Sequence, residues 1–110
     1  MPRERRHPKS LFWKIADEMI ASGKAEEGTM MGHPCLRTEG QFFATILGER
    51  EEVVVKLPKD RVTELIREEV GLPFAPAGRK FKEWVALPKG QSRRWRRLIA
   101  DAREFVGGSS

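Results

Sequence analysis

The chain has 110 residues, of which 39% are hydrophobic and 34% are charged, a composition that suits one soluble globular domain with a single core. No apolar run approaches the roughly 18 residues that a membrane span needs, so we expect no membrane-embedded segment. The basic N-terminus is not followed by an apolar stretch long enough for a secretory signal.

The net charge of +5 is concentrated at the two ends of the chain. Residues 1–9 carry four basic residues against one acidic residue, and residues 93–110 carry five against two. Residues 10–92 are nearly neutral, with twelve basic and thirteen acidic residues. Such basic ends can meet phosphate or an acidic protein, and they can equally be solvated surface.

The first predicted element is a helix that begins at Leu11. Apolar residues recur from there to Ile20 at helical spacing, which predicts one buried stripe. Ser10 is a favourable N-cap for this helix, and Gly23 suits its end. A polar connector, KAEEG, follows.

Strands are predicted after Gly28, where the hydrophobic period changes. TMM and CLR are short apolar stretches separated by GHP, and TEG marks the next turn. Residues 41–47 (QFFATIL) and 52–57 (EVVVKL) are predicted as stronger strands, because β-branched and aromatic residues favour extended backbone. The short turns between these strands make the neighbours antiparallel.

The second half of the chain predicts a helix, a loop, a strand and a helix. The helix runs over residues 60–70 and stops at Gly71. Residues 72–80 contain two prolines and a glycine and are predicted to form an ordered loop. Residues 81–87 alternate like a strand, and residues 92–106 form the last amphipathic helix.

The predicted order is therefore helix, three strands, helix, one or two strands, helix. This order predicts an α+β fold: an antiparallel sheet of about five strands with three helices mainly on one side. No internal repeat or linker divides the sequence. We expect a basic flexible arm at 1–9, a single domain at 10–106 and a flexible tail at 107–110.

Residues 28–37 (GTMMGHPCLR) gather ligand-like side chains: Met30, Met31, His33 and Cys35. Structural zinc sites need four ligands, usually in CxxC or HxxxH pairs, and this chain has one cysteine and two histidines. Met30 and Met31 are neighbours, so on a strand they point to opposite faces. We therefore expect no metal site and no cofactor.

The cysteine is also a weak candidate for a catalytic nucleophile. His33 would share a strand face with Cys35, but the chain has no asparagine, and no aspartate is obviously placed to orient the imidazole. The motifs GxGxxG, GxxxxGK[ST], GxSxG and HExxH are absent from the sequence. We expect a buried structural cysteine, no catalytic residues and no enzyme activity. One unpaired thiol also favours a reducing, cytoplasmic setting.

The most basic motif is RRWRR, at residues 93–97. At about 100° per residue, Trp95 falls on the apolar stripe of the last helix, and the arginines spread over its polar surface. Arg97 can pair with Asp101 one turn later. The candidate nucleic-acid contacts are these arginines and those of the arm: Arg93, Arg94, Arg96, Arg97, Arg3, Arg5 and Arg6.

A wider pattern runs through residues 10–106. MMGHPCLRTEGQFFATI is followed by VVVKLP, a helix, PFAPAGRKFKEWVALP and a helix that ends in AREFV. This order resembles the TfoX/Sxy N-terminal-like domain family and the related MmcQ/YjbR-like small proteins. The residues that carry the resemblance are Met31-Gly32, Gly40, Phe43-Ala44, Lys56 and Trp84-Val85.

The resemblance implies a small α/β fold with an antiparallel sheet and no known catalytic centre. TfoX-type proteins are linked to transcriptional control of competence, and YjbR-type proteins have been proposed to bind DNA. Lys56 and Trp84 can also be explained by packing alone, with no role in catalysis. The stem of Lys56 can pack at the end of a strand, and Trp84 supplies apolar area on a face of the sheet.

We therefore expect a cytoplasmic, non-enzymatic regulatory or protein-interaction module with an unidentified protein partner and no membrane partner. The alternative is a nucleic-acid-binding module that uses the basic arm and the RRWRR helix. The two differ in what the arginines do. A contiguous basic face favours nucleic acid, whereas pairing of each arginine with a carboxylate favours solvated surface.

Overall fold

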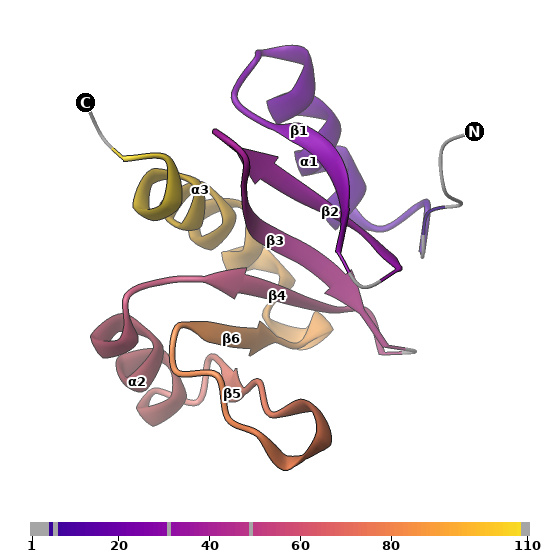
Figure 1. Cartoon of the computed structure of the whole chain (residues 1–110). Helices are drawn as coiled ribbons and strands as arrows, with labels where there is room; N and C mark the ends of the chain where they lie inside the picture. The colour runs from indigo at the N-terminus through magenta and orange to yellow at the C-terminus, as the bar shows by residue number, and fades with distance from the viewer. Residues whose placement is uncertain (1–4, 6, 31, 49, 109–110) are drawn as a thin grey trace.

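The computed structural model describes residues 5, 7–30, 32–48 and 50–108. Its helices are α1 (Leu11–Ala21), α2 (Lys59–Arg67) and α3 (Trp95–Gly107), with 3-10 turns η1 (Pro76–Gly78) and η2 (Lys89–Arg94). Its strands are β1 (Glu26–Met30), β2 (His33–Thr38), β3 (Gln41–Leu47), β4 (Glu52–Lys56), β5 (Leu72–Pro73) and β6 (Trp84–Leu87) (Figure 1). None of the helices in these ranges is long and apolar enough to span a bilayer.

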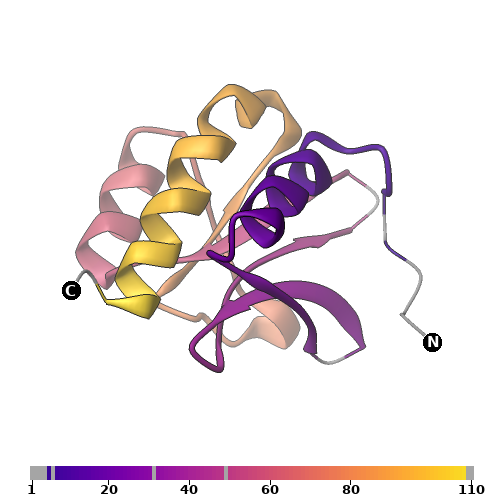
Figure 2. The same cartoon turned by 90° about the horizontal axis from the view of Figure 1, so that it is seen from above.

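The strands form one sheet in the order β1-β2-β3-β4-β6-β5, and every neighbouring pair is antiparallel. The three helices lie on the same side of this sheet, with α3 between α1 and α2 (Figure 2). The predicted α+β class, element order and antiparallel sheet are confirmed. The sheet has six strands, whereas about five were predicted.

The strand segments that go beyond the prediction lie at the two edges of the sheet. β1 begins at Glu26, inside the predicted polar connector and before the predicted TMM stretch, and pairs with β2 along its whole length. β5 is only Leu72–Pro73, at the start of the predicted loop, and pairs with β6. Both strands are defined by backbone hydrogen bonds to a neighbouring strand and not by apolar side chains. The hydrophobic pattern of the sequence therefore gives little indication of where they lie.

Three element boundaries also differ from the prediction. α2 ends at Arg67, and the chain turns so that the buried Val70 donates its N–H to the Leu65 carbonyl at 2.9 Å. Regular α-helix begins at Trp95, because residues 89–94 form 3-10 turns instead. β6 starts three residues later than predicted, after a turn at residues 81–84.

Helix α1 begins where the sequence predicts. The Ser10 hydroxyl accepts a hydrogen bond from the Phe12 N–H at 3.2 Å, which satisfies one of the free donors of the first turn. After the helix, Gly23 adopts a φ of 78°, a left-handed conformation that glycine tolerates without strain.

The hydrophobic core lies between the sheet and the helices. Alternate strand positions such as Leu36, Ile46 and Val55 belong to it, together with large helical side chains such as Trp13 and Trp95. Full burial of one such side chain contributes roughly 1.5–3 kcal/mol. The helices cannot leave the sheet without exposing this layer.

A β-bulge interrupts the pairing of β2 with β3. Leu36 pairs with Ala44, whereas the next residue, Arg37, pairs with Phe42. Phe43 is the extra residue, and both Phe43 and Ala44 are buried in the core. A regular strand alternates between faces, so the bulge turns Phe43 inward and leaves Phe42 on the other face of the sheet.

A test of this packing uses Gly71, which lies buried beside β6. A Cβ atom built there lies 2.4 Å from Cγ2 of Val85, a fully buried, β-branched residue that cannot move aside. We expect Gly71→Ala to lower the free energy of unfolding by about 1–3 kcal/mol, measured by urea denaturation. Gly90→Ala, where nothing lies within 4 Å, is the control and should change it by less than about 0.5 kcal/mol. Equal effects of the two substitutions would contradict the packing described.

Candidate functional site

None of α1, α2 and α3 covers the side of the sheet that faces away from them (Figures 1 and 2). Strand pairing places a row of mostly small residues across this open face, and its four central members are at most 5% exposed. In strand order the row is Gly28, Cys35, Thr45, Val54, Ala86 and Leu72. The larger side chains of Phe42 and Arg37 lie over the Gly28 end of this row. A Cβ atom on Gly28 would be 3.1 Å from the Phe42 ring and 3.3 Å from Arg37 Cδ.

Cations and aromatic rings alternate along one flank of this row. In strand order they are Arg37 of β2, Phe42 of β3, Lys56 of β4 and Trp84 of β6. Arg37 pairs with Phe42 and Lys56 pairs with Trp84, and all four side chains are partly exposed. Directly paired residues have Cβ atoms about 4.5–5.5 Å apart, so each cation is in contact range of the ring with which it is paired. We call these four residues the cation–aromatic stripe.

At the β1 end, the stripe meets an acidic residue. The Glu26 carboxylate lies 3.9 Å from Arg37 Nε, and the two side chains are 69% and 42% exposed. A pair this long and this exposed contributes little binding energy. Arg37 therefore keeps most of its capacity to bind a second anion.

At the other end, the stripe continues into the loop that joins β5 to β6. The rings of Phe74 and Phe81 lie 5.8 Å apart, and the Arg79 guanidinium lies 5.5 Å above the Phe81 ring. The backbone N–H of Trp84 donates to the Phe81 carbonyl at 3.2 Å, which closes the turn that leads from the loop into β6. Two further cations of this loop, Lys80 and Lys82, are exposed.

The arginines of the RRWRR motif lie in the helical layer, on the opposite side of the sheet. Arg96 forms an ion pair with Glu18 of α1 and lowers the pKa of that carboxyl group. Arg97 donates through Nε to Asp101 at 3.1 Å, the i+4 pair that the sequence predicted. The other two arginines of the motif make no ion pair within the described ranges: Arg93 and Arg94.

The one described arginine of the arm is bound to the domain. Arg5 Nη2 lies 2.8 Å from an Asp17 oxygen and 2.9 Å from a Glu27 oxygen, and the guanidinium lies 4.0 Å from the centre of a Trp13 ring. Hydrogen bonds from Arg5 lower the pKa of Asp17, and both carboxylates raise the pKa of Arg5. The two remaining arm candidates lie outside the described residues: Arg3 and Arg6.

The cysteine of the GTMMGHPCLR stretch is fully buried in the row on the open face, as expected. Burial raises the pKa of its thiol to about 11, so Cys35 is uncharged at neutral pH. His33 is only partly buried, and no group of three or more His, Cys, Asp or Glu residues suited to a metal forms among the described residues. The described residues do not include Met31 or the side chain of Met30.

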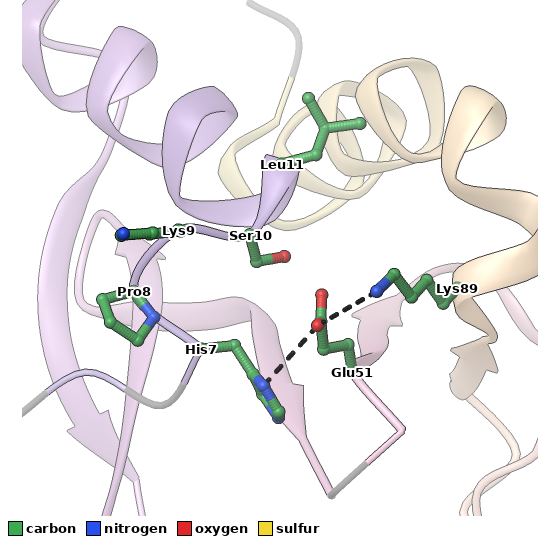
Figure 3. Close-up of a pocket in the computed structure, with 7 residues that line it drawn as sticks. All are labelled: His7, Pro8, Lys9, Ser10, Leu11, Glu51 and Lys89. Carbon is green, nitrogen blue, oxygen red and sulfur yellow. Dashed lines mark hydrogen bonds and ion pairs between the residues drawn. The ribbon is translucent and has the colours of Figure 1, made fainter.

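A shallow hollow of about 410 Å³ lies where the arm meets the start of α1 (Figure 3). His7 Nε2 lies 2.7 Å from the Gly48 carbonyl oxygen, and Nδ1 lies 3.7 Å from the Glu51 carboxylate. Lys89 Nζ lies 3.3 Å from the same carboxylate. These contacts link the arm to the β3–β4 turn and to η2. The Glu51 carboxylate is contacted by both His7 and Lys89, so we interpret the arrangement as a structural contact between these segments.

The stripe was not predicted from the sequence. Lys56 and Trp84 were predicted to be structural residues, and Arg37 and Phe42 were not predicted to lie on a binding surface. The one indication in the sequence was the two-residue period of residues 52–57, which places Lys56 on the opposite face of the strand from the core residues Val53 and Val55. That signal does not say which face the helices cover, so it could not assign these residues to an open surface.

Comparisons of this chain with protein-family models, with curated proteins and with solved structures give no match.

The state of the thiol gives a direct chemical test. The pKa of about 11, against an ordinary 9.0, leaves about a hundredfold less thiolate at neutral pH, and burial excludes the reagent. We expect Cys35 to react with iodoacetamide at least about 100-fold more slowly in the native protein than in concentrated guanidinium chloride. A Cys35→Ser/Ser22→Cys variant, with its thiol at an exposed position, is the control and should react at similar rates in both. Rapid native reaction of Cys35 would contradict the burial.

The Arg5 contacts predict a pH-dependent stability. Asp17 has a lowered pKa in the folded state, so its stabilising contribution is present above the unfolded value of about 3.9 and is lost as the pH falls through the lowered folded value. We expect Arg5→Ala to raise the pKa of Asp17, measured by NMR titration. We also expect it to lower the free energy of unfolding by about 1 kcal/mol at neutral pH. Arg61→Ala, which removes an exposed pair with Glu64, is the control for the loss of a surface charge and should leave the Asp17 pKa unchanged.

Proposed function

We propose that this chain is a non-enzymatic binding module whose contact surface is the open face of its sheet. The observation that carries the proposal is the cation–aromatic stripe, in which Arg37, Phe42, Lys56 and Trp84 come together from four strands on a face that α1, α2 and α3 leave uncovered. Arginine and tryptophan are among the residues that contribute most to binding at interfaces.

The rigidity of the stripe supports a binding role. Its members project from hydrogen-bonded strands, so their backbone is already ordered before a partner arrives. Partial burial restricts their side chains as well. Binding to a preorganised surface costs less conformational entropy than binding to a mobile loop.

The same proposal includes the regulatory role, the kinship and the setting expected from the sequence. We propose that the module acts in regulation through an unidentified partner and that it is related to the TfoX/Sxy N-terminal-like and MmcQ/YjbR-like proteins. The residues that support this kinship are Met31-Gly32, Gly40, Phe43-Ala44, Lys56 and Trp84-Val85. A buried, unpaired thiol supports a reducing, cytoplasmic setting.

The second candidate function is nucleic-acid binding through the arm and the RRWRR helix. The observation in its favour is that Arg93 and Arg94 make no ion pair with the described part of the chain, which leaves two cations at the start of the last helix. Against it, Arg5, Arg96 and Arg97 are each engaged by carboxylates. We rank this surface below the stripe for that reason.

The test is a capture experiment from the native cell with immobilised protein, in which retained proteins and nucleic acids are both analysed. We expect wild-type protein to retain material that the double variant Phe42→Ser/Lys56→Glu loses. The matched control, Arg93→Ala/Arg94→Ala, should retain it. Equal retention by wild type and the stripe variant would overturn the proposal, and loss confined to the arginine variant would support the second candidate. Circular dichroism establishes that both variants are folded.

A further inference from the structure

We propose that the cation–aromatic stripe binds single-stranded nucleic acid, with bases stacked on Phe42 and Trp84 and phosphates held by Arg37 and Lys56. This inference rests on the proposed function, that the open face is the binding surface, and adds the chemical class of the ligand.

The aromatic half of the stripe is suited to bases. Phe42 and Trp84 are partly exposed on an antiparallel sheet, the arrangement in which sheet proteins stack single-stranded bases on aromatic rings. The other two tryptophans, Trp13 and Trp95, are each 1% exposed and belong to the core. Trp84 is therefore the tryptophan that a ligand on this face can reach.

The separation of the rings selects a ligand with unstacked bases. Strand β4 lies between β3 and β6, and neighbouring strands are about 4.8 Å apart, so the Phe42 and Trp84 backbones are about 10 Å apart. The Phe42 ring leans toward Gly28 of β1, away from Trp84, so the two rings are not closer than their backbones. Bases in a duplex repeat every 3.4 Å along each strand and hide their faces from a flat surface. A single strand can splay two bases onto the two rings. Lys56, on the strand between them, is placed for the phosphate that links these bases.

The charges around the stripe differ between its two ends. The loop between β5 and β6, residues 74–83, contains three basic residues and one acidic residue, Glu83, and it ends in the backbone turn that links Phe81 to Trp84. The Glu26 carboxylate lies at the opposite end, beside Arg37. A polyanion is therefore attracted along a path from β2 across β6 to the loop and is repelled beyond β2.

The charges alone would also attract an acidic peptide. Such a peptide has no planar rings to stack on Phe42 and Trp84, so it uses only half of the stripe. The alternation of cation and ring matches the alternation of phosphate and base in a nucleic-acid strand. An acidic polymer is therefore the comparison ligand in the test.

The experiment measures binding of labelled oligothymidine and oligouridine of about 16 nucleotides to the full chain by fluorescence anisotropy, over a range of salt concentrations. We expect binding at low salt that weakens as salt rises, together with quenching of tryptophan fluorescence. Phe42→Ala and Trp84→Ala should each weaken binding by about 5- to 150-fold, the range measured for one stacked base. Lys56→Ala should reduce the slope of log affinity against log salt by about 0.7.

Two further variants separate stacking from charge and from folding. Trp84→Phe keeps a ring and should bind within about tenfold of wild type while losing the quenching. Arg93→Ala/Arg94→Ala, in the helical layer, should bind as wild type does. If Trp84→Ala does not fold, Lys56→Ala and Trp84→Phe still decide the question.

The inference is overturned by absence of binding at low salt, by equal affinity for a duplex or for polyglutamate, or by stripe variants that bind normally. Its failure differs from failure of the proposed function. If the stripe-dependent material captured from cells is protein that resists nuclease treatment, the open face is a binding surface but its ligand is not nucleic acid. If nothing depends on the stripe, both proposals fail.

Discussion

Coverage of the sheet by helices on one face is the constraint on which the remaining features depend. Because strand side chains alternate, every residue that packs under α1, α2 or α3 has neighbours that point away from them. Val55 lies in the core, and Lys56 beside it cannot. The open face is thus a necessary consequence of a two-layer fold. Its surface chemistry is decided by residues that the core does not select.

The basic residues on the two sides of the sheet differ in how far they are paired with carboxylates. On the helical side, Arg96 and Arg97 are paired with Glu18 and Asp101, so much of the positive charge of the RRWRR segment is neutralised within the fold. On the open side, Lys56 makes no ion pair among the described residues. The sequence motif with the highest charge density is therefore a poorer guide to a binding surface than scattered residues that the strands bring together.

Much of the fold could be predicted from the sequence, and the candidate site could not. Helical periodicity and the Ser10 cap located α1, and the valine run located β4, because these signals are local. Of the edge strands, β5 was missed and the TMM stretch located only the second part of β1, because pairing with a neighbour defines both strands. The stripe was missed for a related reason. Arg37 and Trp84 are far apart in the chain, and their common face follows only from strand order and from the side that the helices occupy.

The bulge opposite Arg37 has a consequence for how this surface can change. Without the bulge, regular pairing would place Phe43 opposite Arg37 on the open face, and strand alternation would turn Phe42 inward. The chemistry of the open face is therefore encoded in the register of this hairpin as well as in the identity of its residues. A shift of the register would rearrange the stripe with every side chain unaltered, whereas most point substitutions would change one member at a time. Related chains that share the residues of β2 and β3 but pair them without the bulge would present a different surface.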